Sequence, residues 1–479
     1  MTISRRTALG TALAALPRGL AGGGTRSAAP SDKVTLAFIG VGTQGLRVML
    51  QFLQLPDVQA VAVCDANSGS SDYLQFGTNE LKNRVLKVIP NARWGYASED
   101  SHHGSAGCGP ARAAVEQYYA QQKRGEYKGC AEYTDYRELL ASRKDIDAVV
   151  VATPDHTHAV ISAAAMRAGK HVFCQKPMAH SVFEVRRMQE IARETKAVTQ
   201  VAIWNSASEA TRVLCELVWS GIIGPVRHVH NWTNRPTWPQ GIERPAEQQA
   251  VPPYLDWDLW LGPAQFRPYH SAYQPFVFRG WYDFGTGSFG DMGCYSFDTI
   301  FRALKLGAPA TIEASSTKLF KESYPLASVV HFGFPARSGM PPVKVSWYDC
   351  GIKPVRPEGL PDVEKLDSEG MMLVGDKGTL LCDFYGAKPR LLPAKGTASL
   401  PNPPRTLDGY LAQWVAACKG GKPADANFDY TGVVTQTLLL GNIAIRTGEK
   451  LNWDAAKHTT GSAAADLLLN PPYRAGWSI

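Results

Sequence analysis

The stretch "KVTLAFIGVGTQGLRVMLQFLQL", residues 33–55, decides the fold of the first half of the chain. Residues 34–39 are a short apolar run rich in β-formers, which is typical of a parallel strand covered on both faces. Gly40, Gly42 and Gly45 follow in the pattern G-x-G-x-x-G and open a helical pattern. The glycines alone are weak evidence, but a strand before them and a helix after them indicate a dinucleotide-binding turn.

The next strand pattern, "VQAVAVCDA", ends near Asp65, which lies 20 residues after Gly45. An acid at this spacing accepts a hydrogen bond from a ribose 2′-hydroxyl and repels a 2′-phosphate, so the sequence predicts NAD as the cofactor. Gly40 allows the tight turn, Gly42 lets the backbone approach the pyrophosphate, and Gly45 lets the helix pack on the strand. The free N–H groups at the start of the helix are expected to face the phosphates.

After an insertion at 68–131, strand and helix patterns alternate to residue 174, which indicates an open α/β sheet with crossover helices. Ligands of such sheets bind beyond the carboxyl ends of the strands, where "TPDH" (153–156) and "QKP" (175–177) stand. The predicted cofactor contacts are Gly40, Gly42, Thr43, Gln44, Gly45, Asp65, Thr153, Pro154, His156 and Lys176. The adjacent His102 and His103 are interpreted as solvated, and no metal site is expected.

Lys176 follows the apolar strand "HVF" at the sheet edge where the cofactor is expected. A lysine there can hydrogen-bond a substrate hydroxyl and stabilise negative charge that develops during hydride transfer. The alternative is a lysine that ends the strand with its ammonium group in water. The position of Lys176 in the sequence leaves both open.

The bulk composition excludes some function classes. The 479 residues carry a formal net charge of +7 with Lys and Arg scattered along the chain, which does not indicate a nucleic-acid surface. No segment contains the roughly 18 consecutive apolar residues that a membrane span needs. Residues 1–32, with Arg5 and Arg6 before a mildly apolar stretch, are typical of a twin-arginine export signal, although a disordered tail is the alternative. We predict an exported, periplasmic protein, with a cytoplasmic location as the alternative, and mostly free cysteines.

Several stretches together resemble the Gfo/Idh/MocA family of nicotinamide-dependent oxidoreductases. They are "AFIGVGTQG" (37–45), "CDA" (64–66), "DIDAVVVATPDHTHA" (145–159), "HVFCQKPMAHS" (171–181), "WSGIIGPVRHV" (219–229), "LDWDLWLGPA" (255–264), "RGWYDFGTGSFGDMGCYSFD" (279–298) and "RAGW" (474–477). The resemblance covers nearly everything after residue 33.

The resemblance implies an α/β fold with a doubly wound parallel Rossmann sheet and a C-terminal α/β domain that has a large open, mostly antiparallel sheet. The implied organisation is a signal and linker at 1–32, an NAD-binding Rossmann domain at 33–204, and a substrate-binding and oligomerisation domain at 205–479. It also implies a small-molecule carbohydrate substrate and a homo-oligomer, a dimer or tetramer, formed through the C-terminal sheet. Lys176 takes the place of the lysine in the family's Glu-Lys-Pro signature.

The chain departs from the family pattern at two positions. Gln175 stands where the family usually has Glu, and Tyr295 stands where a His is expected four residues after Asp291. On a helix, Asp291 and Tyr295 share a face and can point at one substrate. A tyrosine is a poor base at neutral pH unless a nearby ammonium, such as that of Lys176, lowers its pKa. Either Tyr295 is the acid/base of the reaction, or it only binds substrate while Lys176, His156 or His158 handles the proton.

The second half places tryptophans among charged side chains between residues 231 and 291. Aromatic faces beside fixed polar groups suit sugar rings, although some of these tryptophans are expected to be core. The predicted substrate contacts are Arg279, Asp283, Trp281, Arg235 and Trp238, and the predicted catalytic residues are Lys176, Tyr295 and Asp291.

The function predicted from the sequence is an NAD-dependent oxidoreductase that acts on a hydroxyl of a sugar or glycoside. An exported enzyme would have to keep its cofactor and restore it in every cycle. That requirement also allows a redox-neutral NAD-dependent glycosidase, in which transient oxidation acidifies a neighbouring proton and permits elimination. A third alternative is a non-catalytic sugar- or nucleotide-binding protein, which Tyr295 and Gln175 would favour.

Overall fold

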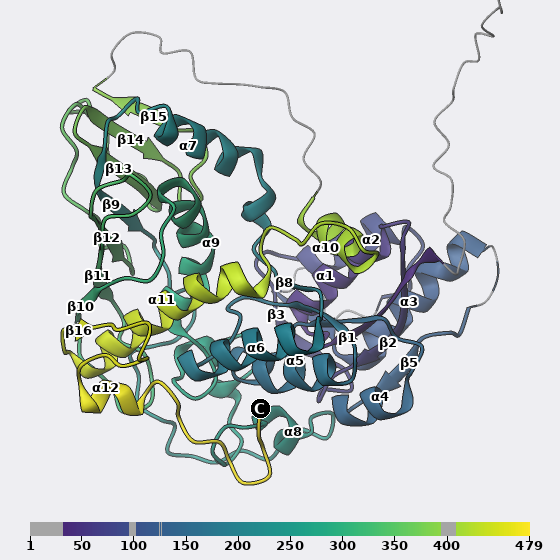
Figure 1. Ribbon diagram of the computed structural model, residues 1–479. Coiled ribbons are helices and arrows are strands. Elements are labelled where there is room, and N and C mark those ends of the chain that lie inside the picture. The colour runs from purple at the N-terminus through teal and green to yellow at the C-terminus, as the bar shows by residue number, and fades with distance from the viewer. Residues whose placement is uncertain (1–31, 95–101, 124, 126, 394–408) are drawn as a thin grey trace, which may run out of the picture.

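The structure is a computed structural model that describes residues 32–94, 102–123, 125, 127–393 and 409–479. The predicted export signal lies outside the described residues. Two β-sheets with a layer of helices between them organise the rest (Figure 1).

The first sheet has six parallel strands in the order β5-β2-β1-β6-β7-β8. Its strands are β1 (Val34–Ile39), β2 (Val58–Cys64), β5 (Ala131–Tyr133), β6 (Ala148–Val151), β7 (His171–Cys174) and β8 (Thr199–Val201). Its helices are α1 (Thr43–Leu53), α3 (Cys108–Lys123), α4 (Tyr136–Ser142), α5 (His158–Arg167) and α6 (Val182–Thr195). Apart from the edge strand β5, the strands are apolar and almost fully buried, because helices cover both faces of a parallel sheet. This is the predicted Rossmann-type sheet.

The insertion after β2 has a structure of its own. It forms an antiparallel hairpin of β3 (Ser70–Leu74) and β4 (His103–Ala106), with α2 (Glu80–Val88) between the two strands. This hairpin was not predicted from the sequence.

The second sheet has eight strands in the order β15-β14-β13-β9-β12-β11-β10-β16, and only β9 and β12 pair in parallel. Its strands are β9 (Val226–Trp232), β10 (Thr311–Ser316), β11 (Ser328–Phe334), β12 (Val343–Tyr348), β13 (Gly370–Gly375), β14 (Gly378–Cys382), β15 (Arg390–Leu392) and β16 (Leu451–Asn452). This confirms the predicted mostly antiparallel sheet.

Helices lie against one face of the second sheet (Figure 1). The helices of this half are α7 (Glu209–Trp219), α8 (Trp257–Leu261), α9 (Gly287–Leu304), α10 (Tyr410–Cys418), α11 (Phe428–Thr447) and α12 (Ala463–Leu467). Single 3₁₀ turns span Asp155–Thr157, Trp204–Ala207, Ser271–Tyr273 and Val277–Gly280. α9 and α11 cross closely, since a Cβ on Gly441 would lie 2.4 Å from a ring carbon of Phe289.

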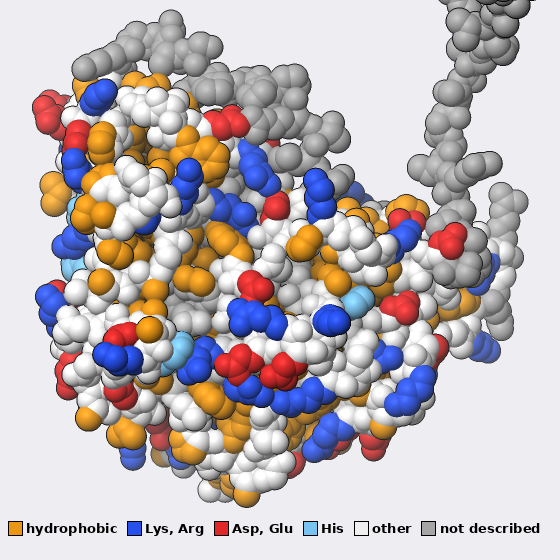
Figure 2. Space-filling view, viewed as in Figure 1, with side chains coloured by type: hydrophobic (Ala, Val, Ile, Leu, Met, Phe, Trp, Pro, Cys, Tyr) orange, Lys and Arg blue, Asp and Glu red, His pale blue; other side chains and the backbone are white. Residues whose placement is uncertain are grey.

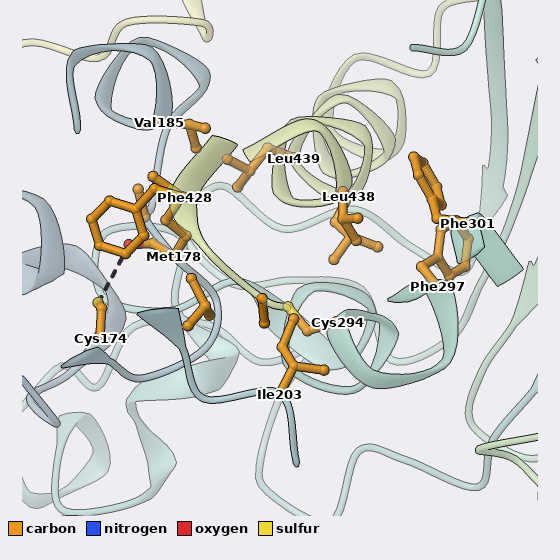
Figure 3. Close-up of a cluster of buried hydrophobic side chains, with 14 of the residues drawn as sticks. Cys174, Met178, Val185, Ile203, Cys294, Phe297, Phe301, Phe428, Leu438 and Leu439 are labelled. Atoms are coloured by element: carbon orange, nitrogen blue, oxygen red, sulfur yellow. Dashed lines mark hydrogen bonds between the residues drawn. The ribbon is translucent and has the colours of Figure 1, made fainter. Parts of the chain in front are cut away.

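One hydrophobic core continues from the first sheet to the second. Figure 3 shows Cys174 and Met178 from the first half beside Phe428 and Leu439 from the second. α10 also returns to the first half, where Trp414 packs against the rings of Phe52 and Phe173. A long buried contact of this kind holds α9 at a fixed position relative to the carboxyl edge of the Rossmann sheet.

The surface and the cysteines add little to the functional argument. Basic and acidic side chains are interspersed on the face shown in Figure 2. No helix in the described ranges is long and apolar enough to cross a membrane. All nine cysteines are free, as the sequence led us to expect for most of them.

Candidate active site

A cavity of about 650 Å³ lies at the carboxyl edge of the first sheet. The residues that follow β1, β2, β6 and β7 line one part of it, and residues of α9 and of the loops after β9 and α8 line the other. The cavity therefore spans both halves of the chain. We refer to these two parts as the nucleotide half and the substrate half.

The glycine turn has the shape that the sequence predicted. Gly40 has φ +84°, and a Cβ there would lie 2.5 Å from the backbone of Thr153. A Cβ on Gly45 would lie 2.0 Å from the Gly40 carbonyl oxygen, so only glycine lets α1 approach β1 this closely. Gly40, Gly42, Thr43 and Gln44 line the cavity, whereas Gly45 supports the turn from behind.

Asp65 stands at the end of β2 with its carboxylate in the nucleotide half. It accepts hydrogen bonds from the backbone N–H groups of Val41, at 2.7 Å, and Asn67, at 2.9 Å. A carboxylate can accept about four hydrogen bonds, so acceptor sites for ribose hydroxyls remain. Burial raises the pKa of Asp65 to about 6, although the two N–H groups oppose the rise.

Two buried polar atoms in the cavity wall favour a polar ligand. The Thr153 hydroxyl and the Gln175 side-chain amide nitrogen have no hydrogen-bond partner among the described residues. An unpaired buried polar atom costs free energy, and a bound dinucleotide with many acceptors and hydroxyls would remove this cost. The glycine turn, Asp65 and these two atoms together fit NAD, which Pro154 and Lys176 would also contact from the same wall.

The β3–β4 hairpin and the turn after β3 form an additional wall over the nucleotide half. Tyr73 packs against the glycine turn, where a Cβ on Gly42 would lie 2.8 Å from the tyrosine ring. The Thr43 hydroxyl donates to the Leu74 carbonyl at 3.0 Å. Phe76 packs under the guanidinium of Arg47, at 4.3 Å, and against Phe276 of the second half, with ring centroids 5.6 Å apart. The insertion thus connects the glycine turn to the substrate half.

The segment that carries Lys176 is held by contacts on both sides. The Gln175 N–H donates to the Val151 carbonyl at 2.8 Å, which continues the pairing of β6 and β7. Ser181 then begins α6 with a capping box, in which Ser181 and Glu184 satisfy each other's backbone N–H groups. These contacts fix the direction of the Lys176 side chain.

α9 brings two of the predicted catalytic residues to Lys176. The Lys176 ammonium lies 2.5 Å from the nearer carboxylate oxygen of Asp291 and donates to the Asp291 carbonyl at 2.9 Å. Arg279 Nε lies 3.0 Å from the same carboxylate oxygen. One turn further along α9, the ring of Tyr295 lies 5.2 Å from the ammonium. The predicted group of Lys176, Asp291 and Tyr295 therefore meets at one place, and Arg279 joins it.

Burial and ion pairing determine the charges of this group. The side chains of Lys176 and Asp291 form an ion pair and are each only 10% exposed. Burial disfavours the Lys176 ammonium, but Asp291 and Tyr295 outweigh it and raise the pKa of Lys176 above its ordinary value. Burial would raise the pKa of Asp291, yet Lys176 and Arg279 lower it to about 2.

Tyr295 stays protonated at neutral pH. Burial raises its pKa, and the opposing effect of Lys176 is smaller. The direction of this shift argues against the hypothesis that Lys176 lowers the pKa of Tyr295 far enough to make Tyr295 a base. A neutral phenol at this position can donate a hydrogen bond to a substrate oxygen.

His156 and His158 do not present a free nitrogen to the cavity. The His156 nitrogens face the carbonyls of Phe284 and Trp260, and the His158 nitrogens face those of Pro177 and Thr153. Both rings are at most 2% exposed. His156 is thus a buried packing residue, which corrects its prediction as a cofactor contact, and neither histidine is placed to handle the proton.

Three of the five predicted substrate residues line the substrate half: Arg235, Trp238 and Arg279. The other two predictions are wrong. Trp281 is only 1% exposed, and its indole N–H donates to the Ala272 carbonyl inside a separate aromatic cluster. Asp283 forms an ion pair with Arg267 outside the cavity. Trp281 and Asp283 are close to Asp291 in the sequence, but a turn separates them from α9, and they do not line the cavity with Asp291.

Sequence reasoning missed a set of aromatic residues in the cavity wall. Trp204 is 44% exposed and packs against Tyr385 with ring centroids 5.0 Å apart. Tyr385 in turn lies 5.9 Å from the ring of Tyr295, and all three residues line the cavity. Trp204 follows directly on β8, at the same sheet edge as Lys176, and that position was a signal that could have identified it.

Two parts of the chain match domains of a known protein family. Residues 98–203 match the oxidoreductase family Gfo/Idh/MocA, NAD-binding Rossmann fold, and residues 213–320 match its C-terminal α/β domain. The inositol 2-dehydrogenase of Salmonella typhimurium is 29% identical over 123 residues, which are 26% of this chain and 34% of that protein. A glycosyl hydrolase family 109 protein of Shewanella baltica is 27% identical over 198 residues, which are 41% of this chain and 34% of that protein. The match thus spans about a third of each of these relatives.

The fold agrees over a much larger part of the chain. The crystal structure of the WlbA dehydrogenase from Bordetella pertussis, in complex with NADH and UDP-GlcNAcA, aligns with a TM-score of 0.54 at 15% identity, covering 88% of this chain and 99% of that one. This likeness establishes the two-domain fold. The two matched family domains, and not this likeness, show that the chain belongs to the Gfo/Idh/MocA family of oxidoreductases, with NAD as the cofactor of its Rossmann domain.

Proposed function

We propose that this protein is an NAD-dependent oxidoreductase that acts on a hydroxyl of a sugar or glycoside. The observation that carries the proposal is the ion pair of Lys176 with Asp291, a carboxylate that Arg279 also contacts, where the nucleotide half of the cavity meets the aromatic substrate half. When bound, NAD supplies the acceptor or donor of a hydride. The chain itself must bind the sugar, orient one hydroxyl and stabilise the charge on its oxygen.

In this proposal the Lys176 ammonium faces the reacting substrate oxygen. A positive charge held in a largely buried site stabilises an alkoxide far more than it would in water. Asp291, which Arg279 also contacts, holds Lys176 in place, and Tyr295 donates a second hydrogen bond to the substrate. Proton transfer is then assigned to Lys176, which gives a proton in carbonyl reduction and must lose one before it can accept a proton in alcohol oxidation.

The aromatic side chains explain the choice of a sugar. Trp204, Tyr385 and Trp238 offer rings to the cavity, and the C–H faces of a sugar pack well on such rings. The two relatives described above, an inositol dehydrogenase and a glycosyl hydrolase family protein, are consistent with a polyol or glycoside substrate.

A redox-neutral glycosidase is the second candidate. Of the two curated relatives described, the glycosyl hydrolase family 109 protein matches the larger share of this chain. That similarity favours the glycosidase. The same Lys176 environment would serve the transient oxidation and the later reduction. A binding protein without catalysis is less favoured, since Lys176, Asp291 and the complete glycine turn would then have no use.

The wall formed by the β3–β4 hairpin supports a retained cofactor. With Tyr73 on the glycine turn and Phe76 against Phe276, a bound dinucleotide would be covered on the side that is open in a plain Rossmann sheet. Retention fits the proposed export through the twin-arginine route, which carries folded proteins. Replacing Arg5 and Arg6 by lysine tests the route, because the protein should then accumulate in the cytosol.

We also propose a homo-oligomer that covers the outer face of the second sheet. Side chains of β9, β11 and β12, among them His228, His331 and Tyr348, remain partly exposed, and a partner subunit would bury them. Light scattering of the purified protein tests this, and a monomer at micromolar concentration would contradict it.

The proposed function is tested with purified protein and a series of alkyl glycosides, with release of reduced nicotinamide and product mass as the readouts. The matched variant Lys176→Met should lose turnover by at least about 10³-fold, because the charge on the substrate oxygen would lack its main stabilisation. Retained turnover in Lys176→Met would contradict the assignment.

A further inference from the structure

Arg235 enters the substrate half of the cavity from a well-anchored loop. The Thr233 N–H donates to the Tyr348 carbonyl at 3.0 Å, and the Cys350 N–H donates to the Arg235 carbonyl at 2.6 Å, so the loop after β9 is fixed to the end of β12. The side chain is close enough to Tyr385 to affect the pKa of that phenol. Arg235 thus lines the cavity beside Tyr385, a ring that Lys176 also influences.

The guanidinium of Arg235 is poorly satisfied by the protein. Its Nε is buried and has no hydrogen-bond partner among the described residues, and its Nη1 donates only a long bond of 3.3 Å to the Thr237 hydroxyl. No carboxylate in the described part of the chain lies within ion-pairing distance of it. Glu369, the acid that also influences Tyr385, accepts a hydrogen bond from the Thr233 hydroxyl instead.

The other charged groups of the substrate half do not compensate Arg235. Lys176 and Arg279 both contact the single carboxylate of Asp291, which leaves an excess of positive charge before Arg235 is counted. Asp155 also lines the cavity, but it is only 4% exposed, and its carboxylate accepts a hydrogen bond from the Thr286 hydroxyl. Its single negative charge does not balance Arg235 together with the excess positive charge of Lys176 and Arg279. The substrate half is therefore positive, with one arginine edge free to donate.

We propose that the substrate carries a carboxylate, as a uronic acid or uronide does, and that Arg235 binds it. This inference rests on the proposed function for the identity of the site. The free Nε edge of a guanidinium matches a carboxylate in a two-point contact, which a neutral hydroxymethyl group cannot reproduce. The aromatic wall binds the ring, Lys176 faces the reacting oxygen, and Arg235 selects sugars with an anionic group.

The test compares binding of uronides and their neutral counterparts by isothermal titration calorimetry on the nucleotide-containing protein. The probes are the methyl α- and β-glycosides of glucuronic and galacturonic acid and the four corresponding hexosides. We expect at least one uronide to bind roughly 30-fold or more tightly than its hexoside, with affinity that falls as salt is added. Arg235→Gln should weaken this uronide by about 10²-fold more than the hexoside, and Arg235→Lys should recover part of the difference.

Arg227→Gln is the matched control. Arg227 lies at the other end of β9, outside the cavity, in an exposed ion pair with Asp376, so its loss should leave the ratio of uronide to hexoside affinity unchanged. Equal melting temperature and nucleotide content show that the Arg235 variants are folded.

The outcomes separate this inference from the proposed function. No uronide preference in the wild type, or an equal loss of uronide and hexoside binding in Arg235→Gln, overturns the inference even if neutral glycosides are oxidised. Arg235-dependent uronide binding without any turnover supports the inference and contradicts the proposed function.

Discussion

Replacing Asp291 by Asn removes the one carboxylate that two cations share. The ammonium of Lys176 and the Nε of Arg279 lie 2.5 and 3.0 Å from the same oxygen of Asp291. At an effective dielectric constant of about 20, charges 2.5 Å apart attract by roughly 6 to 7 kcal/mol, part of which only offsets desolvation. Breaking a buried pair from one side typically costs about 3–5 kcal/mol, and we expect the free energy of unfolding to fall by that amount in Asp291→Asn.

The pH dependence of stability gives an independent estimate. The pKa of Asp291 falls from 3.8 to about 2 on folding. A depressed carboxyl pKa stabilises the folded state above the unfolded pKa and stops doing so as the pH falls through the folded value. The contribution is roughly 2 kcal/mol at neutral pH, lost between about pH 5 and pH 2.

The assay is chemical denaturation of a double-mutant cycle of Asp291→Asn, Lys176→Gln and the double variant. The double variant should be more stable than the sum of the two single losses predicts, because it no longer leaves Lys176 uncompensated. Asp376→Asn, which breaks the exposed pair with Arg227, is the control and should cost at most about 1 kcal/mol. A loss of less than 1 kcal/mol in Asp291→Asn, with additive effects in the cycle, would refute the reasoning.

Asp291→Asn should also move the rising limb of the pH–rate profile for alcohol oxidation to lower pH, because the pKa of Lys176 falls with its partner gone; an unmoved limb would argue against Lys176 as the proton-handling group. NAD affinity should weaken as the pH falls below about 6, where Asp65 gains a proton, and Asp65→Asn should remove this dependence; fluorescence titration with NAD checks it, and a flat wild-type profile would contradict it. Tyr295→Phe should lower kcat/KM by about 10- to 100-fold, the loss of one hydrogen bond, without changing the pH profile; a lost alkaline limb would reinstate Tyr295 as the base. Tyr73→Ala should raise the amount of nucleotide lost on dialysis, measured by absorbance of the dialysate, and equal loss from the wild type would show that the hairpin does not retain it.

The parts of the fold that could be predicted were those with a strong local pattern. The glycine turn, Asp65 and Lys176 all follow short buried strands, and parallel strands carry their ends to one edge of a sheet. Asp291 and Tyr295 could be paired because a helix repeats its face every four residues. These relations hold within one element or within one sheet.

The errors concern contacts between elements that are far apart in sequence. Trp281 and Asp283 precede Asp291 closely, but the turn at Gly285–Thr286 directs them into another cluster. Trp204 and Tyr385 meet across 181 residues, and no local pattern records such a meeting. The direction of the pKa shift of Tyr295 likewise depends on burial, which raises this pKa more than the ammonium of Lys176 lowers it. The sequence showed the nearby ammonium but not the burial.

The most direct test of the central claim is the mass of the product formed from a glycoside. Purified protein, without and with a trace of NAD, is incubated with neutral and anionic glycosides, and the Lys176→Met variant is run alongside. We expect a glycoside lighter by two hydrogens with the wild type and none with the variant. Free sugar and aglycone with no net reduced nicotinamide would replace the oxidoreductase by the redox-neutral glycosidase, and unchanged glycosides throughout would contradict both.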